Sequence, residues 1–144
     1  MRKYRKAVFI AVYRKEGKKI LYLILKRKLH WKGWEFPKGG IENKETETSA
    51  VKRELKEETH QFPIKIIKFK EKGKYRYPKF LDDRPNIIGQ TYRLFSAQIK
   101  DKKIKIDKKE HLAYKWLEFK KAIKILTWPN QKKCLRIVNR HINH

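Results

Sequence analysis

Carboxylates gather on one short segment of a strongly basic chain. The 144-residue sequence holds 40 Lys and Arg against 15 Asp and Glu, yet seven of those acids lie between Glu35 and Glu58. We expect a helix over 46–59, with Thr46 as its N-cap. An α-helix turns about 100° per residue, so Glu57 and Glu58 lie within about 60° of Glu54. Carboxylate oxygens this close together suit Mg²⁺ or Mn²⁺ as ligands. The segment therefore predicts a divalent-metal site on a helix.

A solvated acidic face is the alternative interpretation, because glutamate is a good helix former and needs no further reason to be present. Val51 and Leu55 argue against it, since they form an apolar stripe beside the carboxylates and turn this face towards the protein interior. Lys52 and Lys56 point to the far side of the helix and cannot neutralise the cluster. Carboxylates near the interior need a cation, which favours the metal site.

The spacing of these acids matches a known pattern. Glu45 follows Gly39 after five residues, and Arg53-Glu54-Leu55-Lys56-Glu57-Glu58 follows after seven more. This pattern resembles the Nudix box, the signature of hydrolases that cleave nucleoside diphosphates linked to another group. His60 and Gln61 depart from the box, which has glycine and an apolar residue there. A histidine in a left-handed helix cap costs about 1 kcal/mol, so the departure affects the helix end and none of the acidic positions.

The resemblance implies a role for each matching residue. Four ligands to Mg²⁺ or Mn²⁺ are implied, namely the carbonyl of Gly39 and the carboxylates of Glu54, Glu57 and Glu58. Arg53 matches an arginine that orients the glutamates, with Glu45 as its partner, and an ordinary surface ion pair is the alternative. For the general base we expect Glu57 first and Glu110 second. Bound ions would neutralise a pyrophosphate and lower the pKa of a water that attacks phosphorus in line.

Three segments outside the box bear on the substrate. Trp34–Gly40 (WEFPKGG) and Ile88–Gln90 resemble both the dinucleoside tetraphosphate hydrolases and the RNA pyrophosphohydrolases, whereas Glu110–Leu117 (EHLAYKWL) looks most like the former. The resemblance implies asymmetric cleavage of diadenosine tetraphosphate to AMP and ATP. Removal of pyrophosphate from triphosphorylated RNA ends is the alternative. A non-catalytic RNA-binding module on the same scaffold is disfavoured, because every acidic position of the box is present.

Candidate substrate-binding residues lie on both sides of the acidic segment. The expected loop over 70–86 interleaves cations with aromatic residues. Cations can hold phosphates and a tyrosine ring can stack on a base, which makes Tyr77 and Lys79 candidates. The alternative is a solvated loop whose aromatic residues fold back on the core. Lys38 is a candidate phosphate contact, and Trp34 either stacks on a base or packs under the glycine loop.

The formal net charge of +25 favours a polyanionic partner. A nucleotide polyphosphate or RNA would fit, and biased genomic composition with solvated lysines is the alternative cause of the charge.

The single cysteine, Cys134, excludes an internal disulfide and is expected to be a small buried residue. The apolar run Ala7–Tyr13 is too short to span a membrane. We therefore expect a cytoplasmic monomer with no membrane association.

The order of the expected elements is strands, helix, strands and helices, which is typical of an α/β or α+β sandwich. We expect one domain over 1–144, and the resemblance implies the Nudix fold, a mixed β-sheet between α-helices. The expected strands are 6–13, 20–26, 64–69, 87–99 and 114–117, and the expected helices are 46–59, 118–126 and 131–141. Structural roles are expected for His111, Trp116 and Trp128.

Overall fold

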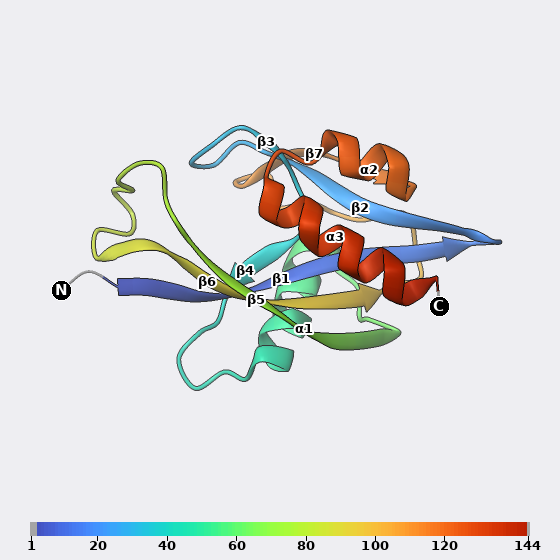
Figure 1. Cartoon of the computed structure of the whole chain (residues 1–144), viewed down its shortest axis with the longest axis horizontal. Helices are drawn as coiled ribbons and strands as arrows, with labels where there is room; N and C mark the ends of the chain where they lie inside the picture. Colours follow the sequence, from blue (N-terminus) through green and yellow to red (C-terminus); the bar gives the residue numbers. More distant parts are fainter. Residues whose placement is uncertain (1–2, 144) are drawn as a thin grey trace.

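The computed structural model describes residues 3–143 (Figure 1). These residues form seven strands and three helices. In chain order they are β1 (Lys3–Glu16), β2 (Lys19–Arg27), β3 (Gly33–Glu35), β4 (Lys38–Gly40), α1 (Glu47–Thr59), β5 (Lys65–Arg76), β6 (Ile87–Gln98), β7 (His111–Leu117), α2 (Phe119–Ile125) and α3 (Pro129–Ile142). No helix among the described residues is long and apolar enough to cross a membrane.

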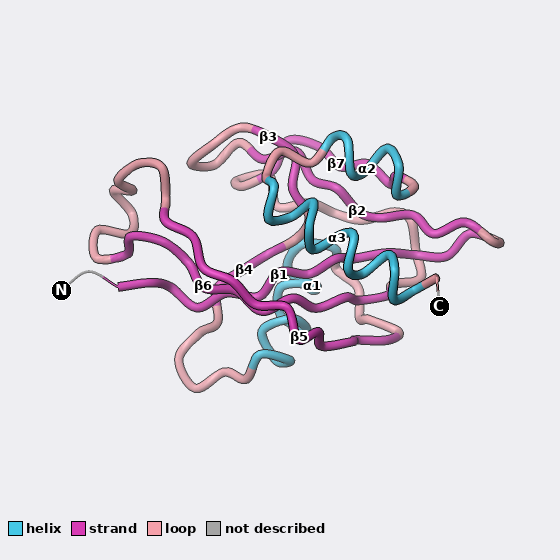
Figure 2. The backbone as a smooth tube through the Cα atoms, in the orientation of Figure 1, coloured by secondary structure: helices cyan, strands magenta, loops and turns pink. Residues whose placement is uncertain are grey.

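The strands form one mixed sheet in the order β3-β2-β1-β6-β5, with β4 paired to β1 and β7 paired to β2. The β1–β6 pair is parallel and the other pairs are antiparallel. Helix α1 covers one face of the sheet, and α2 and α3 cover the other (Figures 1 and 2). The expected mixed sheet between helices is confirmed.

The central strand β1 is apolar on both faces because helices cover both. Its segment 7–13 is buried throughout. Phe9 packs in the core under α2 and α3 with Leu135 and Val138, whereas Val8 packs in the core under α1 with Val51 and Leu55. A strand buried on both sides reads as a continuous apolar run rather than an alternating one. This run therefore fixes the centre of the molecule. The buried thiol of Cys134 lies in the first of these cores, as expected.

Strand β5 runs to Arg76, although a loop was expected from residue 70 onwards. Its register with β6 shifts between Lys68 and Lys72, and the two strands then pair regularly as far as Arg76. The sequence prediction was wrong because β5 is an edge strand with a sparse apolar face. Its charged residues look like those of a loop, although their alternation fits a strand with one side in solvent.

Helix α1 has the ends that the sequence predicts. Thr46 is the N-cap, and its side chain accepts a hydrogen bond from the backbone N–H of Ser49 at 3.0 Å. His60 ends the helix in the left-handed region, with φ of 60° and ψ of 26°. Val51 and Leu55 are fully buried and Lys52 and Lys56 are exposed. The carboxylate face therefore lies beside the buried stripe, as the helical geometry requires.

Replacing His60 by glycine should stabilise the fold. Glycine adopts the left-handed conformation without a steric penalty, so His60→Gly should raise the free energy of unfolding by about 0.5–1 kcal/mol. Lys56→Gly is the matched control, because Lys56 is exposed within the same helix and glycine there should cost about 0.5–1 kcal/mol. Urea denaturation of both variants measures the effect. Equal destabilisation by both substitutions would contradict the prediction.

Candidate active site

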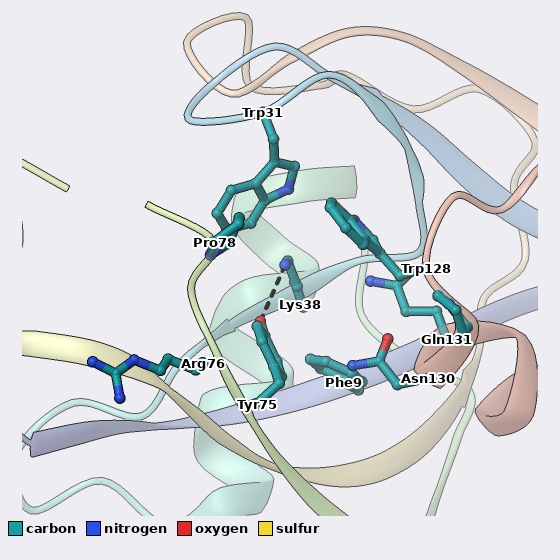
Figure 3. Close-up of a pocket in the computed structure, with 10 residues that line it drawn as sticks. Phe9, Trp31, Lys38, Tyr75, Arg76, Pro78, Trp128, Asn130 and Gln131 are labelled. Carbon is teal, nitrogen blue, oxygen red and sulfur yellow. Dashed lines mark hydrogen bonds between the residues drawn. The ribbon is translucent and has the colours of Figure 1, made fainter. Parts of the chain in front are cut away.

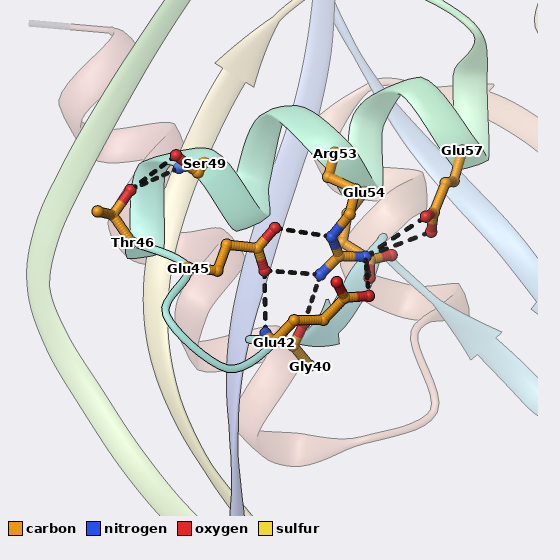
Figure 4. A network of polar contacts seen from close by, with 8 residues as sticks. All are labelled: Gly40, Glu42, Glu45, Thr46, Ser49, Arg53, Glu54 and Glu57. Atoms are coloured by element: carbon orange, nitrogen blue, oxygen red, sulfur yellow. Dashed lines mark hydrogen bonds and ion pairs between the residues drawn. The ribbon is translucent and has the colours of Figure 1, made fainter.

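One guanidinium organises the carboxylates of α1 (Figure 4). Arg53 Nε donates to Glu45 Oε2 at 2.8 Å, and Arg53 Nη2 donates to Glu45 Oε1 at 3.0 Å. Nη2 also donates to the carbonyl of Gly40 at 2.7 Å, and Nη1 donates to Glu54 Oε1 at 2.8 Å. Bidentate pairs between a guanidinium and a carboxylate are strong and geometrically specific. The Arg53–Glu45 pair therefore ties α1 to the chain that follows β4.

Glu54 lies against the backbone of β4. Its burial raises the pKa of the carboxyl to about 7, despite the hydrogen bond from Arg53. A Cβ at Gly39 would overlap the Glu54 carboxylate, so a side chain at this position would separate the strand from the helix. Glu57 lies further out, with 56% of its side chain exposed and Oε2 3.5 Å from Arg53 Nη1. Two of the implied metal ligands, Glu54 and Glu57, therefore meet at Arg53 Nη1.

Buried ionisable groups lie next to these carboxylates. Glu35 Oε2 accepts a hydrogen bond from Arg27 Nη1 at 3.0 Å and lies 3.0 Å from His111 Nε2. Lys38 Nζ lies 3.6 Å from Glu35 Oε1. On its other side, His111 Nδ1 lies 3.4 Å from Glu58 Oε2. Glu35, Glu58 and His111 are all buried. These contacts define a buried charge chain, which runs from Arg27 and Lys38 through Glu35 and His111 to Glu58.

The members of the buried charge chain fix one another's protonation. Burial alone would raise the pKa of Glu35, but Lys38, His111 and Arg27 outweigh burial and lower it to about 2. Burial alone would lower the pKa of His111, but its contacts with Glu35 and Glu58 raise it to about 9. For Lys38 burial prevails and lowers the pKa to about 8. At neutral pH Glu35 is therefore a carboxylate and His111 an imidazolium.

The acidic residues fit a divalent cation. Donor atoms of Glu58, Glu110 and His111 lie within 4.8 Å of one another. Glu58 Oε2 is buried and makes no well-aligned hydrogen bond with any described residue, its ion-pair contact being His111 Nδ1 at 3.4 Å, and burial raises the pKa of this carboxyl. A buried carboxylate with incomplete hydrogen bonding can accept a further cation as a partner. Both ring nitrogens of His111 face carboxylates, Nε2 that of Glu35 and Nδ1 that of Glu58, so the other available donors are carboxylate oxygens, which suit Mg²⁺ or Mn²⁺.

Two hollows meet beside β4. The first, the acidic cleft, is lined by the carboxylates of Glu42, Glu54, Glu57, Glu58, Asp107 and Glu110 and by the cations of Arg5, Arg27, Lys38, Arg53 and Arg84. The second, the aromatic cavity, has a volume of about 330 Å³ and is lined chiefly by the rings of Phe9, Trp31, Tyr75 and Trp128 (Figure 3). Lys38 and Trp31 line both hollows.

Lys38 occupies the junction of the two hollows. Its Nζ lies 4.8 Å from the centroid of the Trp31 ring and 3.5 Å from the hydroxyl of Tyr75 (Figure 3). The Tyr75 hydroxyl in turn donates to Gln90 Oε1 at 2.6 Å. These contacts hold an ammonium group where an apolar surface meets a charged one.

The other substrate-binding candidates lie in different places. Tyr77 is buried beside the aromatic cavity, where its hydroxyl accepts a hydrogen bond from Arg84 Nη1 at 2.8 Å. Lys79 is exposed and lines neither hollow. Trp34 also lines neither, and packs on the core with Lys26 and Lys115 over its ring. The structure thus brings Lys38 to the site and places Trp34 and Lys79 outside it.

Several residues of the site escaped the sequence analysis. Trp128 was expected to serve only in packing, yet its ring lines the aromatic cavity. Phe9 comes from β1 and Trp31 from the loop after β2, and neither was singled out. Tyr75 lies in the segment of interleaved cations and aromatic residues that the sequence analysis did single out, and the Trp128-Pro129 pair marks the start of α3. Glu35 and His111 are 76 residues apart, so their pairing left no local pattern.

Comparison with known proteins agrees with this geometry. The family model described as NUDIX domain matches residues 3–136. The RNA pyrophosphohydrolase of a Nitratiruptor species is 35% identical over 126 residues, which cover 82% of this chain and 81% of the relative. The RNA pyrophosphohydrolase of Hydrogenovibrio crunogenus is 32% identical over 127 residues, covering 81% and 74%.

A solved structure shows the same fold. The binary complex of a Caenorhabditis elegans Ap4A hydrolase superposes with a TM-score of 0.78 at 24% identity, covering 96% of this chain and 98% of that one. At this identity the likeness concerns the fold alone. The family match, the curated relatives and the carboxylate cleft agree on a hydrolase of phosphoric anhydride bonds. The chain belongs to the Nudix family.

Proposed function

We propose that this Nudix hydrolase removes pyrophosphate from the 5′-triphosphate end of RNA in a reaction that depends on Mg²⁺ or Mn²⁺. The observation that carries the proposal is the junction of the two hollows at Lys38 and Trp31. An apolar cavity lined by aromatic rings suits a base, and a cleft with carboxylates and cations suits metal-bound phosphates. A terminal nucleotide could then occupy both hollows at once.

The cations of the cleft would bind the phosphates. Arg5, Arg27, Lys38 and Arg84 line it together with the α1 carboxylates. Arg27 and Lys38 are held by Glu35, so their charges are placed before a substrate arrives. Because these cations are already in place beside the triphosphate, they would bind it and offset the negative charge that develops on the leaving pyrophosphate.

The metal would be held by Glu54, Glu57 and Glu58 with the carbonyl of Gly39. When bound, the metal ion would neutralise part of the negative charge of the pyrophosphate and lower the pKa of a water molecule. Arg53 orients Glu54 and contacts Glu57. Glu57 is the proposed general base because its side chain is exposed in the cleft, where water can reach it. Glu110, which lies near Glu58, is the second candidate.

Two observations favour RNA over a dinucleotide. The curated relatives are RNA pyrophosphohydrolases, at 35% and 32% identity. The net charge of +25 also suits a long polyanion. Together they reverse the preference that the sequence segments alone suggest. A dinucleoside tetraphosphate stays the second candidate, because the segments Trp34–Gly40 and Glu110–Leu117 resemble hydrolases of that class.

Turnover should be faster on RNA than on the dinucleotide. With magnesium, a short 5′-triphosphorylated RNA should release pyrophosphate with a higher kcat/KM than diadenosine tetraphosphate shows. RNA turnover should also fall more steeply as salt rises, since more counterions are released on binding. Faster formation of AMP and ATP from the dinucleotide would establish the second candidate instead. Absence of turnover on both substrates would exclude both.

Replacing Glu57 by glutamine should remove turnover and leave nucleotide binding intact. Loss of a general base typically costs a factor of about 10²–10⁴ in kcat. Glu47→Gln is the matched control, because Glu47 lies on the same helix outside the cleft and pairs with Lys68. Single-turnover kinetics and nucleotide binding with Ca²⁺ present would be measured. Full activity in Glu57→Gln would assign the general base elsewhere, with Glu110→Gln as the next variant.

Two tryptophan variants identify the ring that binds the base. Stacking is worth about 1–3 kcal/mol per base, so Trp128→Ala should raise KM by about 5- to 150-fold with little change in kcat. Trp34→Ala should leave KM unchanged, because Trp34 lies outside both hollows. Melting curves would show whether either variant is destabilised. The reverse pattern would restore Trp34 as the stacking residue.

A further inference from the structure

One end of the α1-facing side of the sheet is not covered by α1. The starts of β1 and β6 project away from the helices there (Figure 2). The strand register places three rows across β1, β6 and β5 on this face, namely Tyr4–Gly89–Arg76, Lys6–Thr91–Lys74 and Val8–Arg93–Lys72. Directly paired residues lie side by side, and residues two apart share a face. Only the row of Val8 reaches the core under α1.

Cations dominate the exposed positions of these three rows. We call the exposed residues Lys6, Lys72, Lys74 and Arg76 the basic face. No carboxylate lies within ion-pair distance of these four among residues 3–143. Nearer the helix the charges are balanced, because Glu47 pairs with Lys68 at 2.7 Å and with Arg93 at 3.7 Å. The basic face therefore carries an excess of positive charge, and Glu47 borders it on the side of α1.

One cation of the basic face, Lys74, is held in place by an aromatic ring. Lys74 Nζ lies 4.2 Å from the centroid of the Tyr4 ring. The ring lies over Gly89, where an added Cβ would come within 2.8 Å of it. A cation over an aromatic ring is attracted by the negative face of the ring, even at an exposed site. One ammonium group is thus held above the sheet before any partner arrives.

The basic face adjoins the aromatic cavity across one strand. Successive side chains of β5 point to opposite faces, so Tyr75 enters the cavity whereas Lys74 and Arg76 belong to the basic face. Arg76 also lines the rim of the cavity (Figure 3). β5 is at the edge of the sheet, so no further strand lies between the aromatic cavity and the basic face. A chain leaving the cavity would meet the basic face after crossing this edge.

We propose that the basic face binds the phosphates of the single-stranded RNA that follows the terminal nucleotide. The proposal rests on the proposed function, which seats that nucleotide in the aromatic cavity. Lys72, Lys74 and Arg76 repeat about every 6.7 Å along β5, as alternate residues of a strand do. Cations spaced along a strand can contact consecutive phosphates without reading sequence. The basic face thus extends the site beyond the nucleotide at which hydrolysis occurs.

The test compares two triple variants of equal charge. Lys6→Gln/Lys72→Gln/Lys74→Gln removes three cations of the basic face. Lys120→Gln/Lys121→Gln/Lys124→Gln removes three exposed cations from α2, on the other side of the sheet. Binding of a 20-nucleotide single-stranded RNA with a 5′-hydroxyl is measured by fluorescence anisotropy over a range of salt. This probe requires no hydrolysis.

The basic-face variant should bind the RNA at least ten-fold more weakly at low salt. Its slope of log K against log[salt] should be shallower by about 2, because each phosphate contact on a single strand contributes about 0.7. The α2 variant should bind like the wild type. Hydrolysis of a triphosphorylated dinucleotide should be the same in all three proteins, whereas KM for a triphosphorylated 20-mer should rise only in the basic-face variant.

Three results would overturn the inference. Equal loss of RNA binding in both variants would show that only total charge counts. Unchanged RNA binding in the basic-face variant, with the melting curve preserved, would remove this face from the RNA path. If the basic-face variant keeps RNA binding and loses only its binding to anionic phospholipid vesicles, the face belongs to a membrane surface. Failure of the wild type to hydrolyse any triphosphorylated RNA would instead overturn the proposed function, and the anisotropy result would stand by itself.

Discussion

The site depends on the guanidinium of Arg53. Its hydrogen bonds join residues from three segments, namely the end of β4, the loop before α1 and α1 itself. Exposed ion pairs contribute little to stability, because solvent screens them and the side chains lose entropy. Arg53 differs from such a pair, since it is 23% exposed and its partners include a backbone carbonyl and the largely buried Glu54. Without Arg53, the hydrogen bonds that join β4, the loop and α1 would be lost, and the contact between Gly39 and Glu54 would lack their support.

The buried charge chain separates the two halves of the acidic cleft. Arg27 and Lys38 lie at one end, where phosphates would bind, and Glu58 lies at the other, where a metal would bind. Glu35 and His111 alternate in sign between them. Buried charges are costly unless paired, and each member here has a partner of opposite sign. The chain thus holds anion-binding and cation-binding groups side by side without letting them neutralise each other directly.

Local signals in the sequence predicted what depends on local geometry. The N-cap at Thr46, the buried stripe of Val51 and Leu55 and the left-handed His60 each follow from helix geometry over a few residues. The second half of β5, from residue 70 to Arg76, was not predicted, because the apolar face of this edge strand is sparse and its charged residues look like those of a loop. The aromatic cavity could not be predicted either. Its rings come from four separate segments that only the tertiary fold brings together.

The distribution of charge has more influence on binding than its total. At physiological ionic strength the Debye length is about 8 Å, so a lysine elsewhere on the surface adds little to the affinity of a bound phosphate. Such lysines raise the rate of encounter with a polyanion. Affinity must come from cations that touch the substrate, which under the proposed function are those of the cleft and of the basic face. The acids between Glu35 and Glu58 are compatible with this surface because Arg53 and the buried charge chain neutralise part of their charge locally, and a divalent cation would neutralise more. Under the proposed function, the net charge of +25 therefore acts on a polyanionic substrate at long range, and the carboxylate cluster acts on it at short range through the bound metal.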